Sequence, residues 1–502
     1  MAANRPPTAR TAGVTEGTRT PDLQDHNLAL PPAELRPPCL RRLIPRWRHG
    51  TRERQSATES ADRHALIHQN DQREGPAGEA DFDRPTAVCQ TGSVTITSTT
   101  SPLQQIDEAI DALLTAHDPG ITPDVEFRGA RFDAGLAWVH FAVGSGGLGL
   151  RPDLNRHIEA RLRAAGAGPA HPTSFFMNLA GPTIATHGSD DVRARFLRPM
   201  FTGQETWCQL FSEPGAGSDF AGLACKAVRD GDEWIVNGQK VWNTLAHLAD
   251  WGMLVTRSNP DVPKHKGLTY FTVDMRSPGV EVRPLRQITG EAEFNEVYLT
   301  DARIPDGHRI GAEGEGWRVA LTTLMNERTA IGGGAGGGGA GGGKPRRGGA
   351  ANDALAVWNR LPDSERTGAR KDELMRLWVR GEVGRLTNMR VAETAKAGNP
   401  GPEGSVSKLE FAEFNKRLYN FCVDLMGMDG QVGYDYTFRR PEQLDATGAD
   451  RGPQYAFLRV RANSIEGGTS EILRNILGEQ ILGLPGEPRV DKDQPWISVP
   501  RN

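Results

Sequence analysis

Two glutamates in this chain stand in settings where a carboxylate could act as a catalytic base. Glu466 lies beside two glycines in the stretch SIEGGTSEIL, and Glu327 lies far upstream, next to Arg328. A carboxylate removes a proton efficiently only when it is held within reach of the group that loses it. Which glutamate can act as the base therefore depends on the helices and loops that position the two carboxylates.

The segment 313–331 is predicted to form a helix that presents a charged pair near the core. Successive side chains turn by about 100° along a helix, which gathers an apolar stripe from Trp317, Leu321, Leu324 and Ile331. Arg328 falls inside this stripe and Glu327 lies on its edge. Because adjacent residues of a helix do not face each other, these charges must find partners elsewhere or serve a site. A buried structural salt bridge remains the alternative.

The glycine stretch near the end of the chain is predicted to be a loop that leads into a helix. Thr469 or Ser470 would be the N-cap, and Glu471 suits the positive end of the helix dipole. Such a helix end favours a phosphate or a developing oxyanion. An ordinary, well-capped helix is the alternative interpretation.

A second ligand-binding pattern is the turn SEPGAGSD at residues 212–219. Its glycines let a planar or phosphorylated ligand approach the main-chain N–H groups, and Ser212 and Ser218 add hydroxyl groups. GQKVWNT follows soon after, where Trp242 offers a stacking surface and Thr244 a further hydroxyl. An ordinary turn is the alternative for the first motif taken alone.

The texture of the chain changes from helical to β-rich and back to helical, which predicts an α+β fold. The β-rich part consists of short apolar runs separated by Asp-Gly, Asn-Gly and Pro-Gly. The predicted organisation is a disordered extension at 1–103, a helical domain at 104–205, a β domain at 206–306, a helical bundle at 307–484 with a flexible glycine-rich insert at 332–350, and a polar tail at 485–502.

Composition limits the class of protein. The 502 residues are 37% hydrophobic and 24% charged with a net charge of -4, which favours a soluble globular protein and argues against a nucleic-acid partner. The five cysteines are widely spaced and form no metal-binding pattern, so we expect a reduced, cytoplasmic protein without a metal. No apolar run is long enough to predict a membrane span.

Four motifs, in order along the chain, resemble those of the acyl-CoA dehydrogenase family: LFSEPGAGSD, NGQKVWNT, MNERTAIGG and IEGGTSEILRNILGEQILGLP. The resemblance covers about residues 104–485. It implies an N-terminal helical domain, a middle β-barrel domain and a C-terminal four-helix bundle, with FAD bound between the β domain and the bundle at a subunit interface.

The resemblance also implies site residues. The implied FAD contacts are Gln209, Leu210, Phe211, Ser212, Ser218, Trp242, Asn243, Thr244, Thr469, Ser470 and Glu471. The implied substrate contacts are Ser218, Arg328 and Glu466.

The family places its catalytic base in one of two positions. Many members carry it in Tyr-Glu-Gly-Thr, but here Gly467 stands where that glutamate would be and Glu466 where the tyrosine would be. Other members take the base from a Glu-Arg helix and keep a small residue in the loop, which matches Glu327, Arg328 and Gly467. The resemblance therefore implies Glu327 as the base, with Glu466 as the alternative and a chain without a working base as a third possibility.

The implied reaction is the α,β-dehydrogenation of an acyl-CoA thioester to the trans-2-enoyl-CoA, within fatty acid or lipid metabolism. Glu327 would remove the α-proton while the β-hydrogen leaves as hydride to the flavin. The backbone N–H of Gly467 and a flavin ribityl hydroxyl would stabilise the thioester oxygen. The electrons would pass to an electron-transfer flavoprotein.

The family's Arg-x-x-Phe-Gly motif, which reaches the FAD of a neighbouring subunit, is absent from this chain. The resemblance leaves open a homo-oligomer, dimeric or tetrameric, and a heterotetramer with a paralogous subunit. A non-catalytic or half-site subunit and a flavin monooxygenase or oxidase of the same fold are the alternative functions.

Overall fold

The computed structural model describes residues 101–168, 174–330, 347–394, 404–433, 435–489 and 491–500. All of these residues belong to one structural unit, Val94–Asn502. Residues 1–100 and 331–346 lie outside the described residues. The disordered extension and the flexible glycine-rich insert therefore stay predictions, and so do the domain boundaries.

Five helices come first along the described chain: α1 (Pro102–Ala116), α2 (Asp124–Asp133), α3 (Asn155–Ala164), α4 (Ser174–His187) and α5 (Asp190–Thr202). The hydroxyl of Ser101 caps α1 by accepting from the N–H of Gln104. The apolar residues of α1 that recur at helical spacing, such as Ile106 and Ile110, are buried, as their spacing predicts. Gly203 ends α5 in the left-handed conformation.

A single sheet follows. Within the described residues its eight strands are β1 (Trp207–Leu210), β2 (Lys226–Asp230), β3 (Glu233–Lys240), β4 (Trp251–Arg257), β5 (Leu268–Asp274), β6 (Val280–Pro284), β7 (Asn295–Pro305) and β8 (Arg309–Ile310). The order is β6-β7-β3-β2-β4-β5-β8, with β1 parallel to β4. The β2–β3 hairpin turns at Gly231, whose φ is 66°, as the Asp-Gly sequence predicts.

Strand β4 is buried at every position because both faces of the sheet are covered. Met253 and Val255 point into a core that the helices share, whereas Leu254 points into a second core on the opposite face. This alternation is the two-residue period of a strand. The sheet therefore offers a rigid support to the helices that pack on it.

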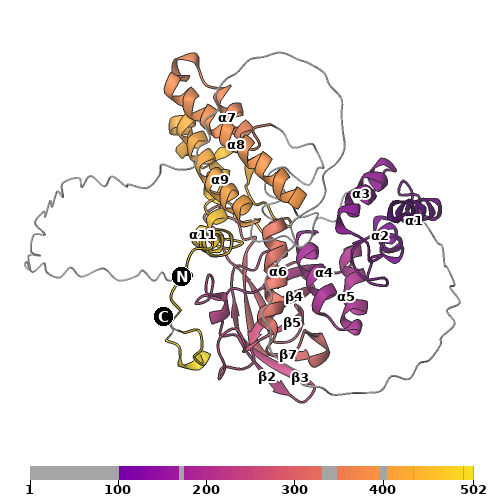
Figure 1. The fold of residues 1–502 in the computed structure, drawn as a ribbon. Coiled ribbons are helices and arrows are strands. Elements are labelled where there is room, and N and C mark those ends of the chain that lie inside the picture. Colours follow the sequence, from indigo (N-terminus) through magenta and orange to yellow (C-terminus); the bar gives the residue numbers. More distant parts are fainter. Residues whose placement is uncertain are drawn as a thin grey trace, which may run out of the picture. The chain divides into compact units, whose positions relative to one another are not determined.

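The chain becomes helical again after β8, with α6 (Gly316–Ala330), α7 (Ala351–Trp358), α8 (Gly368–Thr394), α9 (Gly404–Met426), α10 (Pro453–Arg459) and α11 (Ser470–Ile476). Helix α9 contacts α7, α8, α10 and α11, so it is the centre of this group (Figure 1). Phe414, Leu418 and Cys422 of α9 lie in its apolar core.

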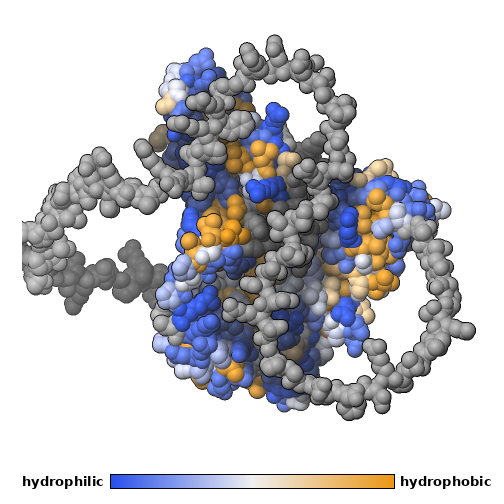
Figure 2. Space-filling view, in the orientation of Figure 1, coloured by the Kyte–Doolittle hydropathy of each residue, from blue (hydrophilic) through white to orange (hydrophobic). Residues whose placement is uncertain are grey.

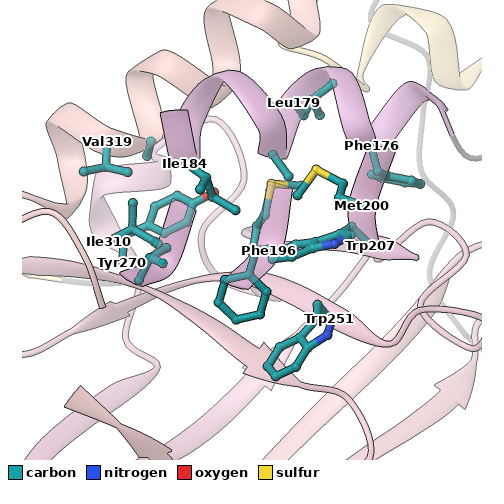
Figure 3. Packing of buried hydrophobic residues seen from close by; sticks show 14 of the residues in the cluster. Phe176, Leu179, Ile184, Phe196, Met200, Trp207, Trp251, Tyr270, Ile310 and Val319 are labelled. Carbon is teal, nitrogen blue, oxygen red and sulfur yellow. The ribbon is translucent and has the colours of Figure 1, made fainter. Parts of the chain in front are cut away.

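The core between helices and sheet is rich in aromatic rings (Figure 3). Phe196 of α5 lies edge-on to Trp207 of β1, with ring centres 5.4 Å apart, and to Trp251 of β4 at 4.8 Å. Val319 of α6 belongs to the same cluster. The first helices, the sheet and α6 thus share one core, which fixes α6 against the sheet.

The last described segment returns to the sheet. Trp496 is buried, its indole lies over the guanidinium of Arg257 at 4.5 Å, and its Nε1 donates to the carbonyl of Gly222 at 3.1 Å. The prediction of a polar tail did not include this contact.

Among the described residues, no helix is both long and apolar enough to cross a membrane. The same residues contain no cluster of side chains suited to a metal ion. Cys208, Cys225 and Cys422 are buried free thiols.

Candidate active site

Glu327 lies in the last turn of α6, and that helix is fixed by polar as well as apolar contacts. The hydroxyl of Thr323 is 2.9 Å from that of Thr183 on α4 and 3.2 Å from that of Tyr270 on β5. Residues four apart share a helix face, so Glu327 continues the face that Thr323 anchors. Its position is therefore set by α4 and β5 together.

The carboxylate of Glu327 is partly buried and accepts one hydrogen bond from the described part of the chain. Nε2 of Gln209 donates to its Oε2 at 3.2 Å. Burial raises the pKa of Glu327 above its ordinary value, and the bond from Gln209 opposes this effect. A carboxylate with a raised pKa is better matched to accepting a proton near neutral pH.

Gln209 is held in place by a hydrogen bond to its main-chain carbonyl. Its carbonyl accepts from Nδ2 of Asn243 at 2.8 Å, and the N–H of Asn243 donates to the carbonyl of Asn295 at 2.9 Å. These bonds tie β1 to the segment after β3. The N–H of Val241 also donates to the carbonyl of Ser212 at 2.9 Å, which joins the two motifs that were predicted to bind one ligand.

Arg328 does not neutralise its neighbour. Within the described residues, neither Glu327 nor Arg328 has an opposite charge within 4.0 Å. Arg328 is partly buried, and burial lowers its pKa. The structural salt bridge that was the alternative for this pair is therefore not found in the described part of the chain.

Glu466, in contrast, is engaged by a cation. Both of its oxygens accept from the guanidinium of Arg459 at 3.2 Å, and Nδ2 of Asn463 donates to Oε1 at 2.7 Å. Arg459 also lies 3.0 Å from Glu293, and both of those side chains are almost fully buried. This pairing gives Glu466 a structural role in holding the loop.

Lys408 of α9 holds the glycine loop through hydrogen bonds to main-chain carbonyls. Its ammonium is fully buried and donates to the carbonyls of Asn463 at 2.7 Å and Gly468 at 2.6 Å. Burial lowers the pKa of Lys408 to about 8, and the charges of Glu466 and Glu327 act against this shift. Lys408 was not predicted as a site residue, although Lys408, Ala412 and Asn415 recur at helical spacing on the buried face of α9.

Gly467 and Gly468 both adopt positive φ, at 64° and 97°, which favours glycine. Within the described residues, the N–H of Gly467 forms no hydrogen bond. The loop thus presents a donor that has no partner.

The three residues after these glycines differ in environment. The hydroxyl of Thr469 caps α11 by accepting from the N–H of Ile472 at 3.2 Å, which confirms a predicted N-cap. Ser470 is buried and donates to Oε1 of Glu413 at 2.7 Å. Glu471 is exposed and pairs with Arg474. Their predicted contacts with a cofactor stay predictions.

The SEPGAGSD turn is built on a buried ion pair that the sequence analysis did not find. Nζ of Lys240, at the end of β3, donates to Oε1 of Glu213 at 2.8 Å and to the carbonyl of Phe211 at 3.0 Å. Glu213 also accepts from the N–H groups of Ala224 and Cys225. These bonds leave Ser212 partly buried and Ser218 exposed, whereas the side chains of Leu210 and Phe211 lie in the two cores.

Trp242 presents a large aromatic surface to solvent. Its φ is 63°, a region that a bulky residue rarely adopts, and the residue is 58% exposed. The main-chain bonds of its neighbours, Val241 to Ser212 and Asn243 to Asn295, hold it in this conformation. Thr244, two residues on, is partly buried.

Two family models match the chain in the region of this site. The acyl-CoA dehydrogenase middle domain matches residues 208–302, and the acyl-CoA dehydrogenase C-terminal domain matches residues 314–482.

Known proteins agree with these matches. The acyl-CoA dehydrogenase IpdE1 of Mycobacterium tuberculosis is 36% identical over 361 residues, which cover 71% of this chain and 86% of that protein. The acyl-CoA dehydrogenase FadE34 of the same organism is 38% identical over 364 residues, 72% of this chain. The match covers 47% of FadE34, so the chain spans about half of that relative's length.

A solved structure shows the same fold. The ChsE4-ChsE5 complex from Mycobacterium tuberculosis has a TM-score of 0.54 at 24% identity, and the match covers 78% of this chain and 100% of that one. The chain therefore belongs to the acyl-CoA dehydrogenase family, a family of flavin-dependent oxidoreductases. The predicted family and α+β fold class are confirmed.

Proposed function

We propose that this chain catalyses the FAD-dependent α,β-dehydrogenation of an acyl-CoA thioester to the trans-2-enoyl-CoA, with Glu327 as the base. The observation that supports this choice most strongly is the contrast between the two glutamates. Glu327 has a raised pKa, and within the described residues its one hydrogen bond comes from a neutral amide, whereas Glu466 is bound by Arg459. A base needs a lone pair free of a cation.

Two groups of the chain act in the proton-transfer step, the carboxylate of Glu327 and the N–H of Gly467. Glu327 takes the α-proton at Oε1, because Oε2 already accepts from Gln209. The electrons of the broken C–H bond move toward the thioester carbonyl, where the N–H of Gly467 donates to the developing negative charge. The enoyl double bond forms as the β-hydrogen leaves with its electron pair. FAD, when bound, supplies the acceptor for that hydride.

The residues present suit a flavin. The exposed indole of Trp242 can cover a planar ring, and Thr244 adds a hydroxyl beside it. Oδ1 of Asn243 is buried and has no hydrogen-bond partner in the described part of the chain, which is the kind of orphan atom that a bound group satisfies. Gln209 of β1 would hold the group together with Ser212, two residues after that strand, and the exposed Ser218. We also propose that the electrons pass to an electron-transfer flavoprotein, that the chain forms an oligomer, and that it is located in the cytoplasm.

The test is an anaerobic titration of the purified full chain with a panel of straight-chain, branched and polycyclic acyl-CoA thioesters. Wild type is expected to carry FAD and to lose flavin absorbance with at least one of them. Glu327→Gln is expected to keep FAD but to bleach at least about 1,000-fold more slowly, because the base is removed while its shape is kept. Glu108→Gln, at an exposed glutamate of α1, is the matched control and should behave as wild type.

Glu466→Gln separates the two candidate bases. If it still bleaches while its fold is less stable, the contact with Arg459 is structural. If Glu466→Gln fails to bleach and Glu327→Gln still bleaches, the assignment of the base is wrong. A wild-type chain that binds no flavin would favour the non-catalytic subunit, and oxygen consumption without another acceptor would favour a monooxygenase or oxidase.

A further inference from the structure

Residues 491–500, which we call the strap, pack beside the SEPGAGSD turn. The N–H of Trp496 donates to the carbonyl of Val262 at 2.9 Å, and the N–H of Ile497 donates to the carbonyl of Pro260 at 3.0 Å. These main-chain bonds fix the strap along the connection between β4 and β5.

A buried arginine lies beneath the strap and binds main-chain carbonyls. Arg257, at the end of β4, is only 2% exposed. Its guanidinium donates to the carbonyls of Ala221 at 2.5 Å, Leu223 at 3.2 Å and Lys264 at 2.7 Å. A buried charge is tolerated only when it is hydrogen-bonded or paired. Arg257 thus joins the chain that follows the SEPGAGSD turn to the β4–β5 connection.

Trp496 covers this arginine and adds a bond of its own. The guanidinium of Arg257 lies 4.5 Å from the ring centre, and Nε1 of the indole donates to the carbonyl of Gly222 at 3.1 Å. Gly222 lies three residues after Asp219, the last residue of the turn. Trp496 therefore holds the main chain close to the point where the turn ends.

A lysine forms a second link between the strap and the turn. Nζ of Lys264 lies 3.0 Å from a carboxylate oxygen of Asp219 and 2.7 Å from one of Asp491 in the strap. Asp219 directly follows Ser218, the exposed hydroxyl that we propose as a ligand contact. The strap therefore acts on the end of the turn through two separate contacts.

The strap is anchored by its aromatic ring. Within residues 491–500, Trp496 is the buried residue, whereas Lys492, Asp493 and Gln494 are exposed. The surface around the strap, which is yellow in Figure 1, is mainly hydrophilic in Figure 2. Replacement of this one ring should therefore release the strap without exposing a large apolar surface.

The β4–β5 connection also reaches the start of the helix that bears the proposed base. The ring of His265 lies edge-on to that of Trp317 in α6, with ring centres 4.6 Å apart. Glu327 lies ten residues further along, nearly three helical turns away. Its position is set by α4, β5 and Gln209. The strap should therefore influence ligand binding more than the chemical step.

We infer that Trp496 is a positioning residue that holds the SEPGAGSD turn in the conformation that binds a phosphate-bearing ligand. The exposed Gly215, Gly217 and Ser218 offer main-chain N–H groups and a hydroxyl, which suit phosphate oxygens. FAD and an acyl-CoA thioester both carry a pyrophosphate. The identity of the ligand rests on the function proposed above, whereas the hold on the turn does not.

The first experiment measures amide hydrogen exchange of the full chain without ligand, by mass spectrometry. In Trp496→Ala, peptides that cover residues 213–223 should exchange ~10-fold faster or more, because the ring and its bond to Gly222 no longer oppose local opening. Peptides from β7 should exchange as in wild type. Ile497→Ala is the matched control, because that side chain is 57% exposed on the same strap.

Two results would overturn the inference at this stage. One is a folded Trp496→Ala whose turn exchanges as in wild type. The other is equal acceleration in the turn and in β7, which would mean that Trp496 acts on global stability alone. If Trp496→Ala does not fold, Trp496→Phe decides, because it keeps a ring over Arg257 but has no N–H for Gly222. Its turn should exchange faster than in wild type, and an unchanged rate would contradict the inference.

The second experiment separates the two ligands. The dissociation constant of FAD, and KM and kcat with an acyl-CoA that bleaches wild type, are measured for wild type, Trp496→Ala and Ile497→Ala. In Trp496→Ala the FAD dissociation constant, KM or both should rise about tenfold or more, with kcat changed by less than about twofold. A rise in the first alone indicates that the turn binds the flavin, and a rise in KM alone indicates the thioester.

Unchanged values of both constants in Trp496→Ala would overturn the inference. If no acyl-CoA bleaches the wild type, the reaction proposed above is wrong. Hydrogen exchange and FAD affinity then still decide whether Trp496 positions the turn, so the two failures can be told apart.

Discussion

Glu327 and Glu466 carry the same carboxyl group but meet different neighbours. Burial raises the pKa of Glu327, and the nearby charge of Glu466 raises it further, whereas Gln209, Arg328 and Lys408 act in the opposite direction. The pKa of the proposed base is thus a balance of several groups. Gln209 is the one that donates a hydrogen bond to it.

This balance predicts a pH dependence. The base works as a carboxylate, so kcat/KM should fall with decreasing pH along a limb that lies above the ordinary glutamate pKa of 4.5. Gln209→Leu removes the bond that stabilises the carboxylate, so the limb should move to higher pH. The measurement is the pH profile of kcat/KM for wild type and variant.

Gln239→Leu provides the control for that experiment. Gln239 lies on β3 and donates to Glu296 and Tyr298, away from the proposed base. Its replacement should leave the limb in place. A limb that stays unmoved in Gln209→Leu as well would mean that the contact with Glu327 does not exist in solution.

The sequence predicted the helix that bears Glu327, because Trp317 and Leu324 recur at its period. It could not predict the bond from Gln209, which lies 118 positions away and meets Glu327 only after β1 and α6 pack together. The ion pair between Glu213 and Lys240 was missed for the same reason. Contacts between distant segments leave no local pattern in a single sequence.

At the scale of elements, α9 supports the glycine loop through one side chain. Lys408→Met would leave the carbonyls of Asn463 and Gly468 without their donor, at a cost of about 1–3 kcal/mol for each buried group. We expect lower thermal stability and a kcat lowered by about tenfold or more, because the N–H of Gly467 is no longer held in one orientation.

A merely structural role for Lys408 would change stability alone. Its charge also lowers the pKa of Glu327, so Lys408→Met should in addition move the acidic limb of kcat/KM upward. Lys416→Met is the control on the same helix, because Lys416 pairs with Glu413 and donates to neither carbonyl of the loop. Equal shifts in both variants would contradict a specific role for Lys408.

Local elements were easier to predict than their partners. Thr469 was one of two residues expected to cap α11, and it does so because its hydroxyl accepts from Ile472 within the same turn. Ser470 donates to Glu413 on α9, a contact that was not predicted, and its implied contact with a cofactor stays a prediction. Capping depends on residues three apart, whereas the direction of Ser470 depends on Glu413, which lies 57 positions earlier in the chain.

At the scale of the whole molecule, one core joins the first helices, the sheet and α6. Phe196→Ala should destabilise the fold by about 3–5 kcal/mol, because the ring packs against Trp207 and Trp251 at the centre of that core. The midpoint of denaturant unfolding should fall with little change in its slope.

Phe438→Ala is the matched comparison, because Phe438 is largely exposed. Its midpoint should change little. If Phe196→Ala unfolds in two separate steps, the first helices and the sheet do not share a single cooperative core, and the position of α6 must depend on other contacts.

Because the ring of Trp242 is exposed, its fluorescence can report whether the proposed site is occupied. Among the tryptophans in the described ranges it is the exposed one, whereas Trp207, Trp234 and Trp251 are buried. Among these described tryptophans, a water-soluble collisional quencher therefore reaches the fluorescence of Trp242 first. Any planar molecule that covers the indole will shield it, so occupancy of the site can be followed by light emission without turnover and before a substrate is known.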